Sequence, residues 1–435
     1  MKHKAKWISI DEALNCVKSE DVIVSALAAA EPKLFLSQLH SRYKNVENVK
    51  VVTCLPMGKY PYFSDDRYLD HFRMDGWFYS PDMRKMHPKG KISYIPNHLH
   101  LSAKKRLFYE QPNIFVGTCS SIDKHGYVSL SLSATYEREM MEKADIVIME
   151  VNKNMPRTFG DTIVSVNEID YLVEVDYEVP CLPVVEPSEK DLKIGKFIAD
   201  LVEDGSTLQL GIGGIPNAVA KALETKKNLG IHTEMFTDGM VDLYEKGVIT
   251  GSEKSLLKQK MVATFALGSK KLYDFIDDNP AVQILRGSYV NDPFVIGQNN
   301  KMVSINTTLE VDLSGQCCSE SIGHRQFSGT GGQSDTAVGA QRSKGGKSII
   351  ALYSTANIRV DGKNERVKVS KIVSSLKKGA AVSLSRNDVD YVVTEYGVAS
   401  LRGTSMKERV ERLIKIAHPE FRDILKEEAK KEMIW

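Results

Sequence analysis

EDGSTLQLGIGGIPNAVAKAL (residues 203–223), followed by GIHTEMFTDGMVDL (residues 230–243), is the stretch that decides the fold. After an Asp-Gly turn, the short apolar run 207–210 predicts a strand. The glycine-rich residues 211–214 come next, and Pro216 stands where a helix would begin, since proline suits the first helical turn. Such a loop directs backbone N–H groups and a helix N-terminus at one point. It therefore suits an anion or a developing oxyanion.

Glu234 stands in a second strand-like run, residues 230–236, which ends at the turn Thr237-Asp238-Gly239. Consecutive strands of an open α/β sheet often lie side by side, and ligands bind at their carboxyl ends. We therefore expect the glycine loop and Glu234 to face one crevice.

The rest of the chain alternates apolar strand-like runs with helical patterns. This alternation predicts an α/β fold with open, mainly parallel sheets and helices on both faces. The other predicted strands are 21–26, 49–54, 113–117, 145–151, 261–266, 302–305, 348–353, 381–384 and 391–394. The predicted helices are 9–17, 34–40, 134–143, one that Ser188 caps, and the amphipathic tail 406–432. Residues 56–101, rich in aromatics and prolines, are interpreted as long loops with helical turns over the sheet ends.

At 435 residues the chain is long for a single core, which indicates two to three domains. Residues 180–187, PCLPVVEP, contain three prolines and no periodicity, and are the best candidate for a linker. We therefore predict an N-terminal α/β domain at 1–185 and a C-terminal α/β domain at 186–435 that carries Glu234.

The composition is that of an ordinary globular protein, with 42% hydrophobic and 26% charged residues. The formal charge of +2 gives no electrostatic reason to expect nucleic-acid or membrane binding. No apolar run approaches the ~18 residues that span a bilayer. None of the six cysteines forms a CxxC pair, so we expect free thiols and a cytoplasmic location.

Two glycine loops have competing interpretations. GIGGIP at 211–216 is not a GxGxxG motif, so a dinucleotide site is a weak hypothesis, and a plain tight turn competes with an anion-binding loop. The second loop, SGTGGQ at 328–333, suits close approach of backbone to a ligand, but a flexible hairpin would explain it equally well.

Three glutamates in apolar or glycine-rich settings are candidate nucleophiles or bases: Glu234, Glu320 and Glu395. A carboxylate is ionised at neutral pH and needs no partner base. Each could instead be a satisfied structural acid, and spacing alone does not choose between the three. No third ligand accompanies His232 and Glu234, so we predict a packed histidine and no metal. Cys317 and Cys318 are adjacent and are predicted to be small buried residues.

Four segments closely resemble the acetyl-CoA hydrolase/transferase branch of the class I CoA-transferases, above all its members that use 4-hydroxybutyrate. GWFYSPDMR at 76–84 and residues 150–170 in the first half resemble this family as well. The resemblance thus covers nearly the whole chain in the family's order. The four segments are LQLGIGGIPNAV (208–219), LGIHTEMFTDGMVDLYEKGVI (229–249), VDLSGQCCSESIGHRQFSGTGGQ (311–333) and SRNDVDYVVTEYGVASLRG (385–403).

The resemblance implies two related α/β domains with the active site between them, and a glutamate that carries CoA as a covalent thioester. By position that glutamate is Glu234. The resemblance also implies a CoA-contacting segment and a loop whose backbone N–H binds the oxyanion. The implied CoA-binding residues are Gln209, Leu210, Gly211, Ile212, Gly213, Gly329, Gly331 and Gly332.

The chain departs from the family's pattern at three places. Ser334-Asp335-Thr336 follows GGQ where many relatives have Val-Asp-Phe. Asn357 stands where a lysine is frequent in the turn after the strand 348–353, which implies weaker binding of a CoA phosphate. Cys318 replaces an asparagine that helps the glutamate in some relatives, so the helper residue is left open.

The function implied is CoA transfer between acetyl-CoA or acetate and a short-chain acid such as 4-hydroxybutyrate or butyrate. The alternatives are an acyl-CoA hydrolase on the same scaffold and a non-enzymatic CoA- or nucleotide-binding protein. The expected ligands are acyl-CoA and carboxylates, with coenzyme A as substrate and no permanently bound cofactor. A homodimer or higher homo-oligomer is expected.

Overall fold

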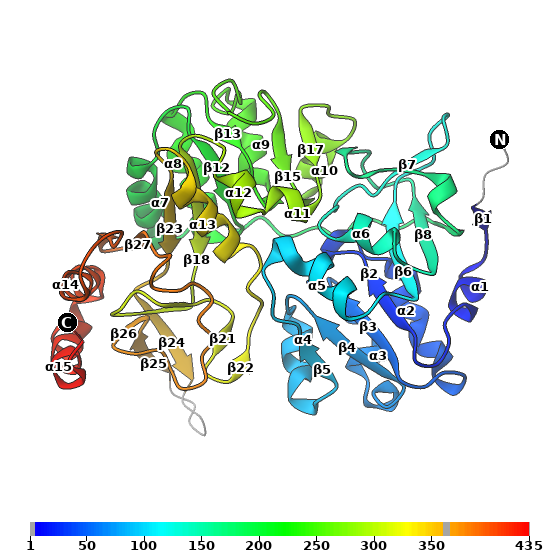
Figure 1. Cartoon of the computed structure of the whole chain (residues 1–435), viewed down its shortest axis with the longest axis horizontal. Coiled ribbons are helices and arrows are strands. Elements are labelled where there is room, and N and C mark those ends of the chain that lie inside the picture. The colour runs from blue at the N-terminus through cyan, green and yellow to red at the C-terminus, as the bar shows by residue number, and fades with distance from the viewer. Residues whose placement is uncertain (1–4, 360–365, 435) are drawn as a thin grey trace.

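The computed structural model describes residues 5–359 and 366–434, which form two halves, each built on an open sheet (Figure 1). The first sheet has the order β1-β11-β8-β6-β2-β3-β4-β5, and every neighbouring pair is parallel. Its strands are β1 (Lys6–Trp7), β2 (Val22–Ser25), β3 (Val49–Thr53), β4 (Phe72–Gly76), β5 (Ile92–Tyr94), β6 (Ile114–Cys119), β8 (Ile146–Asn152) and β11 (Tyr171–Val175).

Both faces of this sheet are buried. Val24 on β2 belongs to one hydrophobic cluster. The preceding residue, Ile23, belongs to another cluster on the opposite face of the sheet. The covering helices include α1 (Ile10–Asn15), α2 (Lys33–Gln38), α5 (Ser102–Tyr109) and α6 (Glu137–Met141). Ser9 and Glu12 form the capping box that begins α1, so the predicted first helix is confirmed.

The second sheet has the order β13-β12-β18-β23-β27-β28 and is parallel except for its last pair. The predicted fold class, with open and mainly parallel α/β sheets, is therefore confirmed. The strands are β12 (Thr207–Leu210), β13 (Gly230–Ile231), β18 (Met302–Thr307), β23 (Lys347–Ala351), β27 (Tyr391–Thr394) and β28 (Gly397–Ser400).

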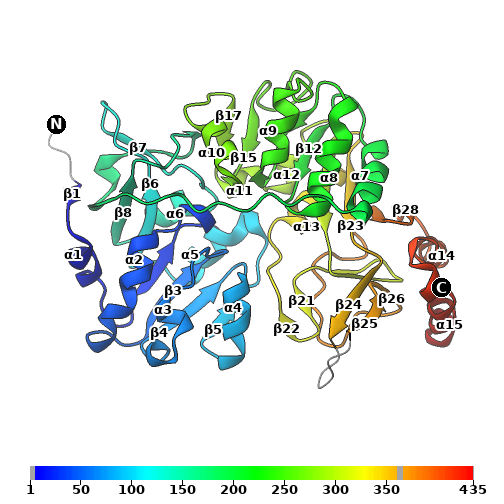
Figure 2. The same cartoon turned by 180° about the vertical axis from the view of Figure 1, so that it is seen from behind.

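The segment between the sheets is extended and crosses the back of the molecule (Figure 2). It leads into α7 (Glu189–Leu201), which begins at a capping box of Ser188 and Asp191. The halves share more than this connection. β9 (Phe159–Gly160) pairs in parallel with β17 (Val282–Ile284), and the largest hydrophobic cluster draws on both halves.

Besides the strand 230–236, which is described below, four predictions of local structure are wrong. Residues 261–266 form two strands, β15 (Met261–Ala263) and β16 (Phe265–Ala266), which pair with β17 and β14 (Met235–Phe236) in different sheets. Residues 56–101 contain β4 and β5, because the alternation Phe72-Arg73-Met74-Asp75 marks a strand despite its charges. Residues 381–384 form no strand, and only the bridge from Leu384 to Cys317 remains. The tail 406–432 divides into α14 (Met406–Ile416) and α15 (Arg422–Glu432), because Pro419 cannot continue a helix.

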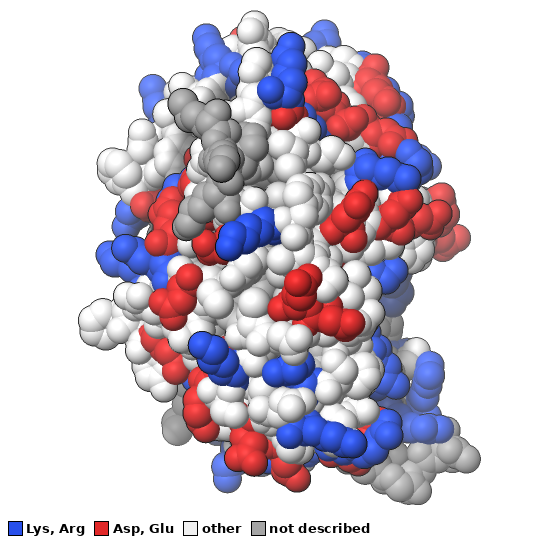
Figure 3. All heavy atoms as spheres, turned by 90° about the vertical axis from the view of Figure 1, so that its right-hand side faces the viewer, with Lys and Arg blue, Asp and Glu red and all other residues white. Residues whose placement is uncertain are grey.

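Charged side chains of both signs are intermixed on the face of the first half that Figure 3 presents. Within residues 5–359 and 366–434, no helix combines the length and the apolar character that crossing a bilayer requires.

Candidate active site

The chain changes sheets at Glu234. The predicted strand 230–236 is in fact two short strands: β13 pairs with β12, whereas β14 (Met235–Phe236) pairs with β16 (Phe265–Ala266). Glu234 lies at the step between them, and its carbonyl accepts hydrogen bonds from the backbone N–H groups of Thr264 and Phe265 at 3.0 and 3.1 Å. Because Glu234 lies between the two strands, its side chain packs within neither sheet, while the two hydrogen bonds fix its backbone.

The carboxylate of Glu234 has three polar neighbours. Asn291 Nδ2 donates to Oε2 at 3.1 Å, and the backbone N–H of Gly332 also faces the carboxylate. Burial raises the pKa of Glu234 to about 7; the Asn291 hydrogen bond lowers the pKa, the Asp335 charge raises it, and the Gly332 N–H lowers it. Burial thus favours the neutral form of this carboxyl group relative to an exposed glutamate.

Both predicted glycine loops lie at helix N-termini. Gly213 is the N-cap of α8 (Gly214–Ala222) and has φ +112°, a conformation that favours glycine. Gly332 is the N-cap of α13 (Gln333–Arg342). Free backbone N–H groups and the helix dipole favour negative charge at such ends.

The second loop is packed against Glu234. A Cβ on Gly332 would lie 1.9 Å from Glu234 Oε2 and 2.1 Å from Asn291 Nδ2, so a larger residue would force one of these two side chains to move. Gly331 has φ +54°, and its Cα faces Glu234 and Phe78. On Gly329 a Cβ would lie 2.2 Å from the Trp77 carbonyl oxygen of the first half. The flexible-hairpin interpretation is therefore wrong.

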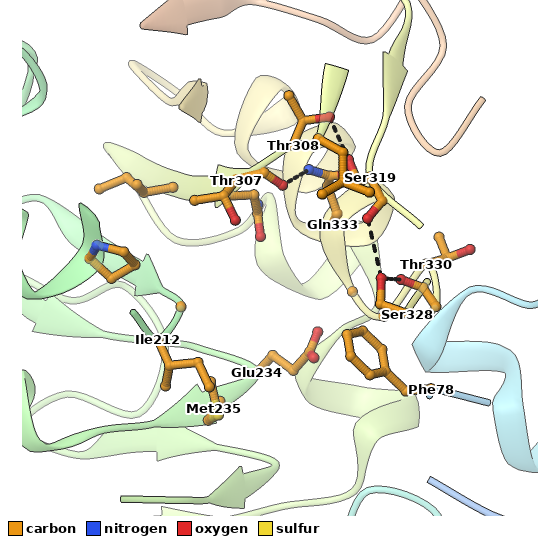
Figure 4. A pocket seen from close by; sticks show the side chains of 18 of the residues that line it. Phe78, Ile212, Glu234, Met235, Thr307, Thr308, Ser319, Ser328, Thr330 and Gln333 are labelled. Atoms are coloured by element: carbon orange, nitrogen blue, oxygen red, sulfur yellow. Dashed lines mark hydrogen bonds between the residues drawn. The ribbon is translucent and has the colours of Figure 1, made fainter. Parts of the chain in front are cut away.

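A cavity of about 340 Å³ opens between the two loops, at the carboxyl ends of β12 and β18. Figure 4 shows the Glu234 carboxylate pointing into it, with the Phe78 ring opposite and Ile212 and Met235 on the other side. The predicted site residues that line this cavity are Glu234, Gln209, Leu210, Gly211, Ile212, Gly329, Gly331 and Gly332.

Two further cavities adjoin the first. One, of about 370 Å³, is lined by Gly213, the start of α8, Tyr353 and Lys371, and shares Ile212 and Pro216 with the first. The other, of about 280 Å³, shares Phe78 and Glu234 with the first and extends into the first half of the chain. Glu234 therefore lies where the 340 Å³ and 280 Å³ cavities meet.

The two other glutamates are held by structural contacts outside the centre of the cavity. Glu320 accepts hydrogen bonds from Thr330 Oγ1 at 2.9 Å and Ser383 Oγ at 2.7 Å, which steadies the second glycine loop. Glu395 accepts from Ser354, and Lys190 Nζ lies 3.2 Å from its Oε1. Both fit the alternative of satisfied structural acids.

His232 is packed as predicted. It is buried, its Nε2 lies 2.8 Å from the Val290 carbonyl oxygen, and burial lowers its pKa to about 4. Cys318 is buried on β20 (Cys317–Cys318), where its Sγ contacts the Ser321 carbonyl oxygen, so it is not the residue that contacts Glu234. Asn357 lies within β24 (Thr355–Arg359), opposite Lys368, and not in a turn.

Sequence reasoning missed Asn291, which directly follows α11 (Gly287–Val290). Its side chain is fully buried and its amide contacts Glu234, 57 residues away in sequence. It also missed Phe78 and Arg84, although both stand in the GWFYSPDMR segment that carried the resemblance.

The fold is of the open α/β class, with its cavity at the carboxyl ends of parallel strands, where such proteins usually bind their ligands. Residues 1–186 match the N-terminal domain, and residues 268–429 the C-terminal domain, of the acetyl-CoA hydrolase/transferase family. The chain therefore belongs to the acetyl-CoA hydrolase/transferase family and is an enzyme of the CoA-transferase type.

The relatives are similar over their full length. The chain is 43% identical over 430 residues to the succinyl-CoA:cyclohexane-1-carboxylate CoA transferase of Geobacter metallireducens, covering 99% of this chain and 96% of the relative. It is 44% identical to the 4-hydroxybutyrate coenzyme A transferase of Clostridium kluyveri, covering 99% and 98%. The crystal structure of 4-hydroxybutyrate CoA-transferase from Porphyromonas gingivalis superposes with a TM-score of 0.80 at 37% identity, covering 98% of each chain.

Proposed function

We propose that the protein transfers CoA between acetyl-CoA and a short-chain carboxylic acid such as butyrate or 4-hydroxybutyrate, through a thioester on Glu234. The observation that carries this proposal is the Glu234 carboxylate, fixed at the N-terminus of α13 beside Asn291 and exposed to a cavity between two glycine loops. Relatives named for 4-hydroxybutyrate, butyrate and acetyl-CoA support the choice of acids.

In the first half-reaction the ionised Glu234 attacks the thioester carbonyl of acetyl-CoA. The C–S bond breaks, CoA leaves as a thiolate, and a mixed anhydride joins Glu234 to the acetyl group. The thiolate then attacks the Glu234 carbonyl carbon, and the C–O bond to the acetyl group breaks. Acetate departs, and CoA remains on Glu234 as a thioester.

The second half-reaction reverses these steps with another acid. Its carboxylate attacks the Glu234 thioester and expels the thiolate, which then attacks the acyl carbonyl of the new anhydride and frees Glu234. Each attack passes through a tetrahedral oxyanion. The Gly332 N–H and the Asn291 amide already face the Glu234 carboxylate and are suited to stabilise the oxyanion that forms there.

The proposed path for CoA runs through the 370 and 340 Å³ cavities, which share part of their lining. The N-terminus of α8 and the ammonium of Lys371 line the first of these, where they favour the phosphates. Lys371 thus offers a cation despite the asparagine at position 357, although its Nζ also lies 4.0 Å from Glu310 Oε1. The residues proposed to contact CoA are Gln209, Leu210, Gly211, Ile212, Gly213, Gly329, Gly331 and Gly332.

The test is to give the protein acetyl-CoA without an acceptor acid. Intact-mass measurement should detect an adduct of CoA size that added acetate removes, and digestion should place it on the peptide containing Glu234. Borohydride should inactivate the protein only after this treatment, because it reduces a thioester but not a free carboxylate. If CoA appears in solution with no adduct and no new acyl-CoA, the protein is a hydrolase and the proposal fails.

A further inference from the structure

Arg84 is a charged residue of the cavities that the proposed mechanism does not use. It lies on α4 (Pro81–Met86) and lines both the 340 Å³ cavity and the 280 Å³ cavity, as Glu234 does. Its Cζ lies 3.8 Å from the centre of the Phe327 ring, so the guanidinium stacks on an aromatic face. The first half of the chain thus supplies a cation to a cavity whose nucleophile comes from the second half.

Within residues 5–359 and 366–434, no anionic group pairs with this cation. In the described part of the chain, no carboxylate oxygen lies within 4 Å of the Arg84 guanidinium, and its buried Nε has no hydrogen-bond partner. Burial lowers the pKa of Arg84, and so does its charged neighbour Arg325, a second cation. A half-buried charge is normally paired in a folded protein, so an unpaired one on a cavity wall indicates an anionic ligand.

CoA is a poor candidate for that ligand. Its phosphates are separated from the sulfur by the whole pantetheine arm, and the sulfur must reach Glu234. Arg84 shares two small cavities with Glu234 and is absent from the lining of the 370 Å³ cavity, where Lys371 and the N-terminus of α8 lie. Arg84 is therefore within reach of groups only a few atoms from the reacting carbonyl.

The charge changes of the proposed reaction point to the acid substrate. When Glu234 becomes a thioester it loses its negative charge, and the acid that leaves or enters carries that charge instead. A cation in the same cavities that is not already paired with Glu234 can hold the acid in the CoA-bearing form of the enzyme. Beyond Arg84, the 280 Å³ cavity has a mainly apolar wall, formed by Leu27, Leu55, Trp77, Leu99 and Phe265.

We infer that Arg84 binds a carboxylate of the acid substrate, whose carbon chain lies in the 280 Å³ cavity. This inference rests on the proposed function for the identity of the acid, although the binding itself can be measured without turnover. The carboxylate is either the one that reacts at Glu234 or the second one of a dicarboxylic acid. The two cases differ in which acids need Arg84.

The binding experiment uses butyrate and succinate, which have the same carbon skeleton and differ in a terminal methyl against a terminal carboxylate. Calorimetric titrations at pH 6 suit the resting protein, because Glu234, with a pKa of about 7, is then mostly neutral like the thioester. Arg84→Gln should weaken binding at least about tenfold, the scale of one charge-assisted hydrogen bond. Arg84→Lys should recover part of the lost binding affinity.

Arg325→Gln is the matched control, since it removes a neighbouring positive charge that lines neither cavity. It should change acid binding by less than about twofold. In steady-state kinetics Arg84→Gln should raise the KM of the acid at least about tenfold and that of acetyl-CoA by less than about threefold. Circular dichroism should match that of the wild type.

The outcomes separate the possibilities. If Arg84→Gln binds both acids more weakly than the wild type, Arg84 holds the reacting carboxylate. If it binds only succinate more weakly, Arg84 holds the second carboxylate. The inference is overturned if the wild type binds neither acid, if Arg84→Gln binds both as the wild type does, or if Arg325→Gln has an equal effect. An equal rise in the KM of acetyl-CoA would also overturn it. Failure of the proposed function is a different result, the absence of a CoA adduct on the wild-type protein.

Discussion

The choice of Glu234 over Glu320 and Glu395 rests on the environment of each carboxylate. Glu234 faces a cavity, whereas Oε2 of Glu320 accepts hydrogen bonds from Thr330 and Ser383. Both oxygens of Glu395 are held, by Ser354 and Lys190. We expect Glu234→Gln to lose at least ~10³-fold in transfer rate, or about 4 kcal/mol of transition-state stabilisation, because no neighbour can replace a covalent carrier.

Glu320→Gln and Glu395→Gln are the controls for that substitution and should keep transfer within about tenfold of the wild type. The measurement is acetyl-CoA-dependent formation of butyryl-CoA by each purified variant. Wild-type turnover by Glu234→Gln would show that the carboxylate is not the carrier.

The same substitution should stabilise the fold at alkaline pH. The pKa of Glu234 is raised from 4.5 to about 7, so between these values the folded state binds more protons than the unfolded one. Stability then falls as pH rises through this window. The free energy of unfolding of Glu234→Gln should exceed that of the wild type by about 1–3 kcal/mol at pH 8. The two values should converge below pH 4.5. Urea unfolding at both values tests this; equal stability at pH 8 would contradict the raised pKa.

The activity of the free enzyme should follow the ionisation of Glu234. We expect kcat/KM for acetyl-CoA to rise tenfold per pH unit and level off above about pH 7, because only the carboxylate attacks. The Asn291 hydrogen bond lowers this pKa and the Asp335 charge raises it. Asn291→Ala should therefore move the midpoint to higher pH, and Asp335→Asn to lower pH. Shifts of the same sign would refute the assigned causes.

Helices and strands that follow from local sequence signals could be predicted. Strand boundaries that depend on pairing with distant segments could not. The strand Thr207–Leu210, the glycine loop and α8 follow from an apolar run, glycines and Pro216. The break at Glu234 was not predictable, because it arises when β14 pairs with β16, about thirty residues further along the chain. The short strand β5 lies at a sheet edge and has almost no pattern of its own.

The residues of the candidate site divide in the same way. Motif residues such as Gly332 were recognisable because a glycine cluster indicates that the backbone approaches another group closely, as Gly332 approaches Glu234. Asn291 carries no motif, and its role depends on a contact made only after both elements are packed. Arg84 was visible within a family segment, but its lack of a partner is a property of the folded cavity.

The two glycine loops should respond differently to one added methyl group. At Gly332 a Cβ would overlap the Glu234 carboxylate, whereas at Gly211 the nearest atom, Pro216 Cγ, lies 4.0 Å away. Gly332→Ala should keep its circular dichroism spectrum but lose transfer by more than ~10²-fold, about 2.7 kcal/mol. Gly211→Ala should mainly raise the KM of acetyl-CoA. Normal kinetics in Gly332→Ala would show that the second loop does not act on Glu234.

In the whole molecule the first half lines the same cavities as Glu234, the proposed nucleophile, which belongs to the second half. Tyr94 OH accepts a hydrogen bond from the backbone N–H of Thr330 at 3.0 Å, and His100 Nδ1 lies 2.8 Å from Asp335 Oδ1. These contacts hold the second glycine loop and the start of α13 against the first half. Activity should therefore require both halves but not the covalent connection between them.

Cutting the linker tests this directly. A protease site inserted after Val184, a residue with 69% exposure, can be cleaved after folding without breaking a strand or helix. We expect the fragments to elute together and to keep at least about half of the transfer rate, because the β9–β17 pairing and a shared hydrophobic cluster still join them. The fragment 186–435 made alone should be inactive, since it lacks Phe78, Arg84 and Tyr94. If the nicked halves separate, the predicted domains 1–185 and 186–435 are independent units; if 186–435 alone is active, the first half is not part of the site.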